Sequence, residues 1–253
     1  MTRIVSIVNQ KGGTGKTTTA VNLSASLARL GKKVLIVDFD PQGNATSGIG
    51  IRLSDNDYGI YEVLCDQKSP EEVIKNTYIK NLDVLPATES LAGANIEFVN
   101  AENREFLLEK KINLIKDNYD YIFIDCPPSL GIITINGIVA SRDILVPVQC
   151  EYYSLEGLGQ LLNTVNMIWK NLQPDLHVLG VVLTMYHSRL KLAREVVNEV
   201  RKNFPYRVFK TFIPRNISLA EAPSFGKSII DYATSSSGAK AYNNLAKEVI
   251  SFE

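Results

Sequence analysis

The sequence predicts an α/β fold in which a mostly parallel, twisted sheet is covered by helices on both faces. Three observations support it. Several short runs are rich in Val and Ile, segments with helical periodicity lie between them, and a glycine-rich turn follows the first run. Apolar runs without polar alternation are typical of strands buried on both faces of a parallel sheet. We therefore expect ligands to bind at the carboxyl edge of that sheet.

These runs predict seven strands: Ile4–Val8, Val34–Val37, Leu82–Leu85, Tyr121–Ile124, Ile144–Val148, Leu179–Leu183 and Val208–Ile213. The periodic segments predict helices over Lys16–Leu30, Ser154–Lys170 and Leu190–Phe204. In the first helix the apolar residues form one stripe, and Gly31 is expected to cap its carboxyl end. No repeat or linker interrupts the chain, so residues 1–253 are expected to form a single domain.

The composition narrows the class of protein. A hydrophobic content of 45% with 21% charged residues is ordinary for a globular chain. Because 27 basic residues balance 27 acidic ones, a globally basic nucleic-acid binder is excluded, whereas a local basic patch is not. Three cysteines without CxxC spacing indicate thiols in a reducing compartment. With no signal-like or membrane-length apolar run, we expect a cytoplasmic protein.

The glycine-rich turn has the features of a phosphate-binding loop. Wrapping a triphosphate requires successive backbone N–H groups that point inward, and the following helix adds its positive end. Lys16 is expected to neutralise β- and γ-phosphate oxygens, and the Thr17 hydroxyl to hold Mg²⁺. Gln10 replaces the first glycine of the usual pattern, so this is a P-loop NTPase with a deviant Walker A motif. Its expected ATP-binding residues are Lys11, Gly12, Gly13, Thr14, Gly15, Lys16, Thr17 and Thr18.

Acidic residues follow two of the predicted strands. Asp125 ends the run Tyr121–Ile124, where a second strand delivers a carboxylate to Mg²⁺, usually through water. Asp38 and Asp40 follow Val34–Val37, and strand alternation places both on the same side. The residues alone leave open which of the two faces the γ-phosphate, and either one could instead cap the next turn.

Five segments resemble the ParA/Soj partition ATPases, in the same order and over nearly the whole chain. They are 11–18, 38–48, 124–129, 147–153, and 213–216 followed by 221–224. The wider class with a lysine at the start of the loop also includes MinD, the nitrogenase iron protein and the arsenite-pump ATPase.

The resemblance implies an ATP-dependent homodimer in which the two nucleotides lie face to face. The expected catalytic residues are Lys11, Lys16 and Asp40. Lys11 would reach across to the partner's phosphates, and Asp40 would orient the attacking water. Pro214 and Asn216 would contact the adenine.

The resemblance also implies a role in chromosome or plasmid segregation, with a role in replication initiation left open. The ATP-bound dimer would bind double-stranded DNA without sequence preference and so associate with the nucleoid. A ParB-type centromere-binding partner with a basic amino-terminal tail would stimulate hydrolysis.

The helix predicted from Leu190 separates an apolar from a basic face. Its apolar face would hold Leu190, Ala193, Val196, Val197 and Val200, and its basic face Lys191, Arg194, Arg201 and Lys202. Because Glu195 and Glu199 border the basic face, the residues alone favour an ordinary solvated face over a DNA surface. The resemblance centres DNA contacts near Arg189, although Ser218 stands where many relatives carry an arginine. The candidate DNA contacts are Arg189, Lys191, Arg194, Arg215 and Lys227.

Three other functions are alternatives to this one. A MinD-like membrane ATPase would need a lysine-rich amphipathic carboxyl-terminal helix, whereas the apolar positions of 239–253 suit packing on the domain. A nitrogenase-type reductase would use Cys126 and Cys150 as cluster ligands, but buried thiols are expected there. A scaffold or transcription regulator that uses ATP only as a dimerisation switch stays open.

Overall fold

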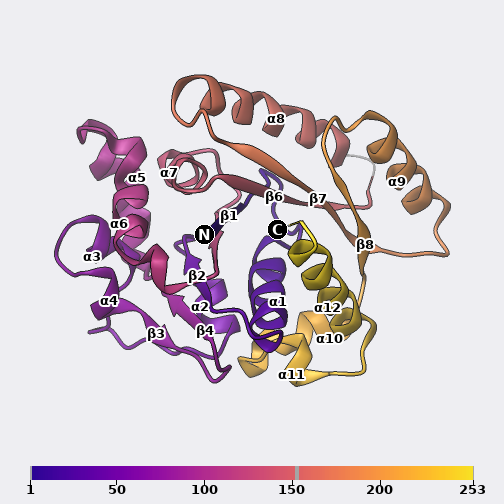
Figure 1. The fold of residues 1–253 in the computed structure, drawn as a ribbon, viewed down its shortest axis with the longest axis horizontal. Helices are drawn as coiled ribbons and strands as arrows, with labels where there is room; N and C mark the ends of the chain where they lie inside the picture. Colours follow the sequence, from indigo (N-terminus) through magenta and orange to yellow (C-terminus); the bar gives the residue numbers. More distant parts are fainter. Residues whose placement is uncertain (1, 152–153, 253) are drawn as a thin grey trace.

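The computed structural model describes residues 2–151 and 154–252. Within them one eight-stranded sheet has the order β3-β4-β2-β5-β1-β6-β7-β8 (Figure 1). Every pairing is parallel except that of β3 with β4. The strands are β1 (Arg3–Ile7), β2 (Val34–Asp38), β3 (Lys75–Asn76), β4 (Leu82–Leu85), β5 (Tyr121–Asp125), β6 (Asp143–Gln149), β7 (His177–Tyr186) and β8 (Val208–Pro214).

All seven predicted strands are confirmed, most of them one or two residues longer than expected. The sequence analysis missed β3, because two polar residues carry no periodic signal. The α-helices are α1 (Lys16–Arg29), α2 (Asn44–Gly48), α3 (Ile60–Leu64), α4 (Pro70–Val73), α5 (Ala94–Glu97), α6 (Leu107–Ile115), α7 (Ile132–Ala140), α8 (Ser154–Asn171), α9 (Lys191–Asn203), α10 (Ile217–Glu221), α11 (Ile229–Tyr232) and α12 (Ser237–Ile250). Short 3-10 turns are η1 (Glu89–Gly93), η2 (Phe98–Asn100), η3 (Arg104–Phe106), η4 (Lys116–Asn118) and η5 (Ala222–Phe225).

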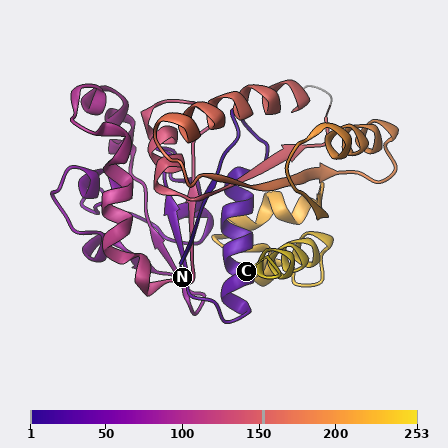
Figure 2. The ribbon, with the colours of Figure 1, turned by 45° about the horizontal axis from the view of Figure 1, so that its top comes forward.

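Helices cover both faces of the sheet, as the sequence predicts (Figures 1 and 2). Strand β5 shows why its residues are apolar throughout. Tyr121 and Phe123 belong to a core shared with α1, α11 and α12, whereas Ile122 and Ile124 belong to a core shared with α6, α7, α8 and α9. Each apolar side chain of β5 is therefore buried under one of two helical layers.

Helix α1 carries the phosphate loop at its amino end and terminates as predicted. Gly31 has φ +90°, and the Lys32 N–H donates to the Leu27 carbonyl at 3.1 Å. This 6→1 bond together with a left-handed glycine is the Schellman arrangement, which confirms Gly31 as the cap.

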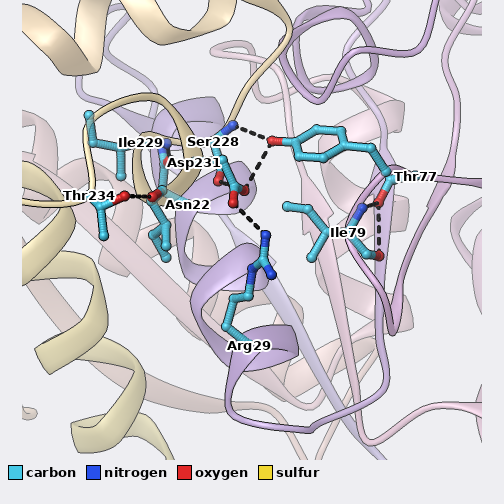
Figure 3. A network of polar contacts seen from close by, with 10 residues as sticks. Asn22, Arg29, Thr77, Ile79, Ser228, Ile229, Asp231 and Thr234 are labelled. Atoms are coloured by element: carbon cyan, nitrogen blue, oxygen red, sulfur yellow. Dashed lines mark hydrogen bonds and ion pairs between the residues drawn. The ribbon is translucent and has the colours of Figure 1, made fainter.

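A polar network fixes α1 against α11 and the turn before β4 (Figure 3). Asn22 accepts a hydrogen bond from the Ile229 N–H at 2.7 Å, and Arg29 forms an ion pair with Asp231. The Tyr78 hydroxyl accepts from the Ser228 N–H at 2.8 Å. These contacts connect α1, the helix that follows the phosphate loop, to α11, and α11 to the turn that contains Tyr78.

The two remaining predicted helices are confirmed as α8 and α9, whose bounds lie within one residue of those expected. In α9 the apolar stripe is buried except for Leu190, which is 55% exposed because it precedes the first helical turn. The prediction that Leu190 lies on the apolar face is therefore wrong. Helix α12 buries Tyr242, Leu245 and Val249 in the core that it shares with α1 and β8, so its apolar face packs on the domain as expected.

Candidate active site

A cleft of about 800 Å³ lies at the carboxyl edge of the sheet. Loops from β1, β2 and β5 form most of its wall, because these three strands are neighbours in the sheet and end at the same edge. The lining residues include Gly12, Gly13, Gly15, Lys16, Thr17, Thr18, Asp40, Pro41, Gln42, Asn44, Asn95, Pro127, Pro128, Ser129 and Met185.

The phosphate loop adopts the backbone that its glycines permit. Gly13 and Gly15 have φ +72° and +89°, in the left-handed region that residues with a Cβ rarely enter. A Cβ added at Gly12 would meet no atom within 4 Å, so the loop encloses open space at that point. Such a loop before a helix amino terminus is a ready-made anion site.

Lys16 is buried, and its Nζ donates to the Lys11 carbonyl at 3.4 Å. Burial lowers the pKa of this ammonium group, whereas the carboxyls of Asp125 and Asp40 oppose that change. The Lys16 ammonium group is thus bound to the glycine-rich loop and stabilised in its charged form by two acidic groups.

Lys11 points elsewhere. Its Nζ lies 3.2 Å from the Glu151 carboxylate, and both side chains are partly exposed. Among the described residues, Lys11 and Thr14 are not part of the cleft lining. Tyr152 and Tyr153, the last two residues of the segment 147–153, lie outside the described residues.

Asp125 is completely buried, and neither of its carboxylate oxygens has a hydrogen-bond partner in the described part of the chain. Burial and the neighbouring charge of Asp38 raise its pKa well above the usual range, while Thr17 and Lys16 oppose the rise. An orphaned carboxylate is costly unless a cation or a bound water satisfies it. This group therefore fits a hydrated cation beside Thr17.

The donor set suits Mg²⁺ delivered with a nucleotide. Among the described residues, no group of three or more His, Cys, Asp or Glu side chains could hold a metal. Mg²⁺ commonly keeps several waters and binds one or two protein ligands plus substrate phosphates. The Thr17 hydroxyl and the orphaned Asp125 carboxylate match that pattern.

The structure separates the two acids that the sequence could not rank. Asp38 is fully buried at the end of β2, where Oδ2 accepts from both the N–H and the hydroxyl of Thr46 at 2.7 Å. Burial raises its pKa to about 6. Asp40 lies beyond the strand and lines the cleft, and it also accepts from the Gln42 N–H at 3.0 Å.

Pro214 and Asn216, the residues expected to contact adenine, have structural partners. Pro214 ends β8 and is in register with Tyr186. Asn216 caps α10 by accepting from the Leu219 N–H at 3.1 Å, and its amide donates to the Ser237 hydroxyl at 3.0 Å. Neither belongs to the described cleft lining, so the adenine contact stays a prediction.

Cys126 and Cys150 are buried thiols, as expected. Burial raises the pKa of Cys150 to about 12 and that of Cys126 further.

The candidate DNA contacts are exposed and lie on three segments. Arg189 is in the loop after β7, and Lys191 and Arg194 begin α9, where Lys191 lies 3.6 Å from Glu195. The backbone N–H of Arg215 donates to the Tyr186 carbonyl at 3.2 Å, which ties it to the same end of β7. Lys227 follows η5 and lines a separate pocket with Arg52.

The sequence analysis missed the residues that fix the phosphate loop from the far side. Gln149 ends β6, and its amide donates to the Gly13 carbonyl at 2.8 Å. Thr184, near the end of β7, donates to the Thr14 carbonyl at 2.8 Å. Polar residues that end buried strands are the same signal that identified Asp125, so this rule could have found both.

Known proteins are similar to this chain in sequence and in architecture. A family model described as an AAA domain matches residues 2–178. The sporulation initiation inhibitor protein Soj of Bacillus subtilis is 55% identical over 98% of this chain and 98% of its own length. The chromosome partitioning protein ParA of Myxococcus xanthus is 49% identical over 98% of this chain and 88% of its own length.

A solved structure adds a comparison in three dimensions. The cobyrinic acid a,c-diamide synthase of Mycobacterium smegmatis, with bound ADP and magnesium, superposes with a TM-score of 0.88 at 34% identity. The match covers 99% of this chain and 94% of that one. The glycine-rich cradle, the buried lysine and the acids that end β2 and β5 thus occur in a fold shared with a nucleotide-binding protein. With full-length identity to proteins named for chromosome partitioning, this chain belongs to the Soj/ParA family of partitioning ATPases.

Proposed function

We propose that the chain is an ATPase that binds ATP with Mg²⁺ in the cleft and drives chromosome or plasmid segregation. One observation carries the ATPase proposal: buried Lys16 begins the helix that follows a glycine-rich loop, and the charges of Asp125 and Asp40 act on its ammonium group. The relatives named as partitioning proteins support the biological role. The continuous eight-stranded sheet supports a single ATPase domain over residues 1–253.

The proposed roles follow from where each group lies. The backbone N–H groups of 12–18 and the amino end of α1 hold the phosphates, and Lys16 neutralises the β- and γ-phosphate oxygens. Thr17 and, through water, Asp125 hold Mg²⁺, which supplies charge neutralisation on the phosphates. Asp40, the acid exposed in the cleft, orients the attacking water.

Substitution of Lys16 and Asp40 tests this assignment. We expect Lys16→Ala to abolish ATP binding, measured by calorimetry, because no other described cation lines the cleft. Asp40→Ala binds ATP but loses turnover by a factor of about 10² or more, the range for removal of a catalytic base. Wild-type turnover in Asp40→Ala, or wild-type affinity in Lys16→Ala, contradicts the proposal.

The second part of the proposal is an ATP-dependent homodimer in which Lys11 acts on the partner's phosphates. The Lys11 side chain is partly exposed, forms an ion pair with Glu151 and does not belong to the described lining of its own cleft. These features support a role across an interface. A cation supplied in trans stabilises charge that develops on the transferred phosphoryl group.

The third part is that the ATP-bound dimer binds duplex DNA without sequence preference and so associates with the nucleoid. A ParB-type partner with a basic tail then stimulates hydrolysis. The exposed cations at the ends of β7 and β8 support the DNA contact. Because the chain has no net charge, only such a local patch can hold a polyanion, and a dimer doubles it. No helix in the described ranges combines the length and apolar character needed to cross a bilayer.

A salt titration tests the DNA surface. Arg189→Glu in the ATP-bound Asp40→Ala background flattens the plot of log affinity against log salt by about two units, one for each protomer. Ser218→Arg steepens it. Lys110→Glu, at an exposed position of α6, is the matched control and leaves the slope unchanged. One common slope for all variants places the DNA surface elsewhere.

A further inference from the structure

Met185 has a strained backbone. Its φ is +51°, although it is neither glycine nor one of the polar residues that commonly enter the left-handed region. It lies one residue before the end of β7, and its side chain lines the nucleotide cleft. Strained conformations persist only where the surroundings over-determine them, and they gather at functional sites.

On the amino side, contacts tie Met185 to the phosphate loop. The hydroxyl of the preceding residue, Thr184, donates to the Thr14 carbonyl at 2.8 Å. The Gln149 amide donates to the Gly13 carbonyl at 2.8 Å and lies 3.2 Å from the Met185 sulfur. A shift of the loop carbonyls therefore acts on both the backbone and the side chain around Met185.

On the carboxyl side, contacts tie Met185 to β8, which runs beside β7 (Figure 1). The carbonyl of the next residue, Tyr186, accepts a hydrogen bond from the Arg215 N–H at 3.2 Å. The Tyr186 ring stacks on the Phe212 ring, with centroids 4.6 Å apart. The pairing of β7 with β8 shifts register between Leu183 and Tyr186. Three residues further along the chain is Arg189.

We propose that Met185 is a positioning residue that passes movement of the phosphate loop to the surface bearing Arg189 and Arg215. A residue with a Cβ occupies only a narrow well at positive φ, so rotation at Met185 absorbs little displacement. Nucleotide that moves the carbonyls of Gly13 and Thr14 then moves Tyr186 as well. This inference rests on the proposed ATP-dependent DNA binding and explains how one site reports to the other.

Two substitutions at one position separate strain from side-chain contact. Met185→Gly makes the left-handed region readily accessible and so increases backbone flexibility at position 185. Met185→Leu keeps the Cβ and removes only the sulfur. The measured quantity is the ratio of duplex dissociation constants with saturating ADP and saturating ATP, in the Asp40→Ala background.

We expect Met185→Leu to keep the ratio of the parent protein. Met185→Gly lowers it by at least about fivefold, the factor that corresponds to the smaller strain energies of such residues. A Gly variant with an unchanged ratio overturns the inference, and so does a Leu variant that loses as much as the Gly variant.

Hydrogen exchange supplies a readout that does not need DNA. In the parent protein, we expect the replacement of ADP by ATP to change the hydrogen-exchange rate of the Arg215 amide, which donates to the Tyr186 carbonyl. In Met185→Gly that change is lost, while protection of residues 12–18 persists and shows that the cleft still folds and binds. If nucleotide changes exchange of the Arg215 amide in the parent protein but the parent binds no duplex, the DNA proposal is contradicted and the positioning role stands. An Arg215 amide that ignores nucleotide in the parent overturns the positioning role.

Discussion

Buried ionisable groups at the strand ends set the chemistry of the cleft. The sequence identified Lys16 and Asp125, because each occupies a fixed place in a strand–loop–helix pattern. The residues alone, without the family resemblance, could not choose between Asp38 and Asp40, because the choice depends on where β2 stops and on Thr46, eight residues later, which donates to Asp38 twice. A tertiary partner at that distance leaves no mark in local periodicity.

Asp38 makes stability depend on pH. Burial raises its pKa from 3.8 to about 6, so the native state keeps a proton that the unfolded chain releases. Its contribution is therefore present at low pH and is lost as pH rises between about 4 and 6, by at most about 3 kcal/mol. In Asp38→Asn this slope is absent.

The measurement is urea unfolding of both proteins over that pH interval, expressed as the difference between their unfolding free energies. The wild-type protein becomes less stable relative to Asp38→Asn as pH rises. A difference that stays constant, or that changes in the opposite direction, shows that Asp38 does not titrate in this interval.

At the scale of elements, length decided part of what the sequence could predict, although α6, α7 and α12, at nine to fourteen residues, were not among the predicted helices. The strands and the helices α1, α8 and α9 were found because each repeats its apolar period several times or is continuously buried. Helices of four or five residues, such as α2 and α11, complete barely one turn and show no period. Their placement depends on close backbone contacts between distant segments.

One such contact joins the loop after α2 to the end of η5. Gly50 has φ +87°, and a Cβ there would lie 2.7 Å from the Gly226 carbonyl oxygen. Gly50→Ala therefore combines the left-handed penalty of about 1–2 kcal/mol with a steric cost of about 1–3 kcal/mol. Chemical denaturation measures the loss.

Gly31→Ala is the matched control. Gly31 has φ +90°, but a Cβ there meets nothing within 4 Å, so only the left-handed penalty applies. We expect the Gly50 variant to lose more stability than the Gly31 variant. Equal losses would mean that the α2–η5 contact yields without cost.

At the scale of the whole molecule, the sheet order explains why one edge carries the site. Strands β1, β2 and β5 are neighbours; the phosphate loop, Asp40 and residues 127–129 line one cleft, and Asp125 lies buried at the end of β5. The adjoining strands β6 and β7 fix that loop from the far side and lead to Arg189. For the proposed dimer, the structure offers a partly exposed Lys11 paired with Glu151.

Sedimentation velocity of the wild-type protein and Asp40→Ala, without nucleotide, with ADP and with ATP, measures whether ATP joins two protomers. We expect monomers without nucleotide and with ADP, a dimer with ATP, and a more persistent dimer for Asp40→Ala because hydrolysis no longer separates the protomers. Adding duplex DNA then moves only the ATP-bound dimer to a faster-sedimenting complex. A protein that binds ATP yet sediments as a monomer in every state would contradict a switch built on two facing nucleotides.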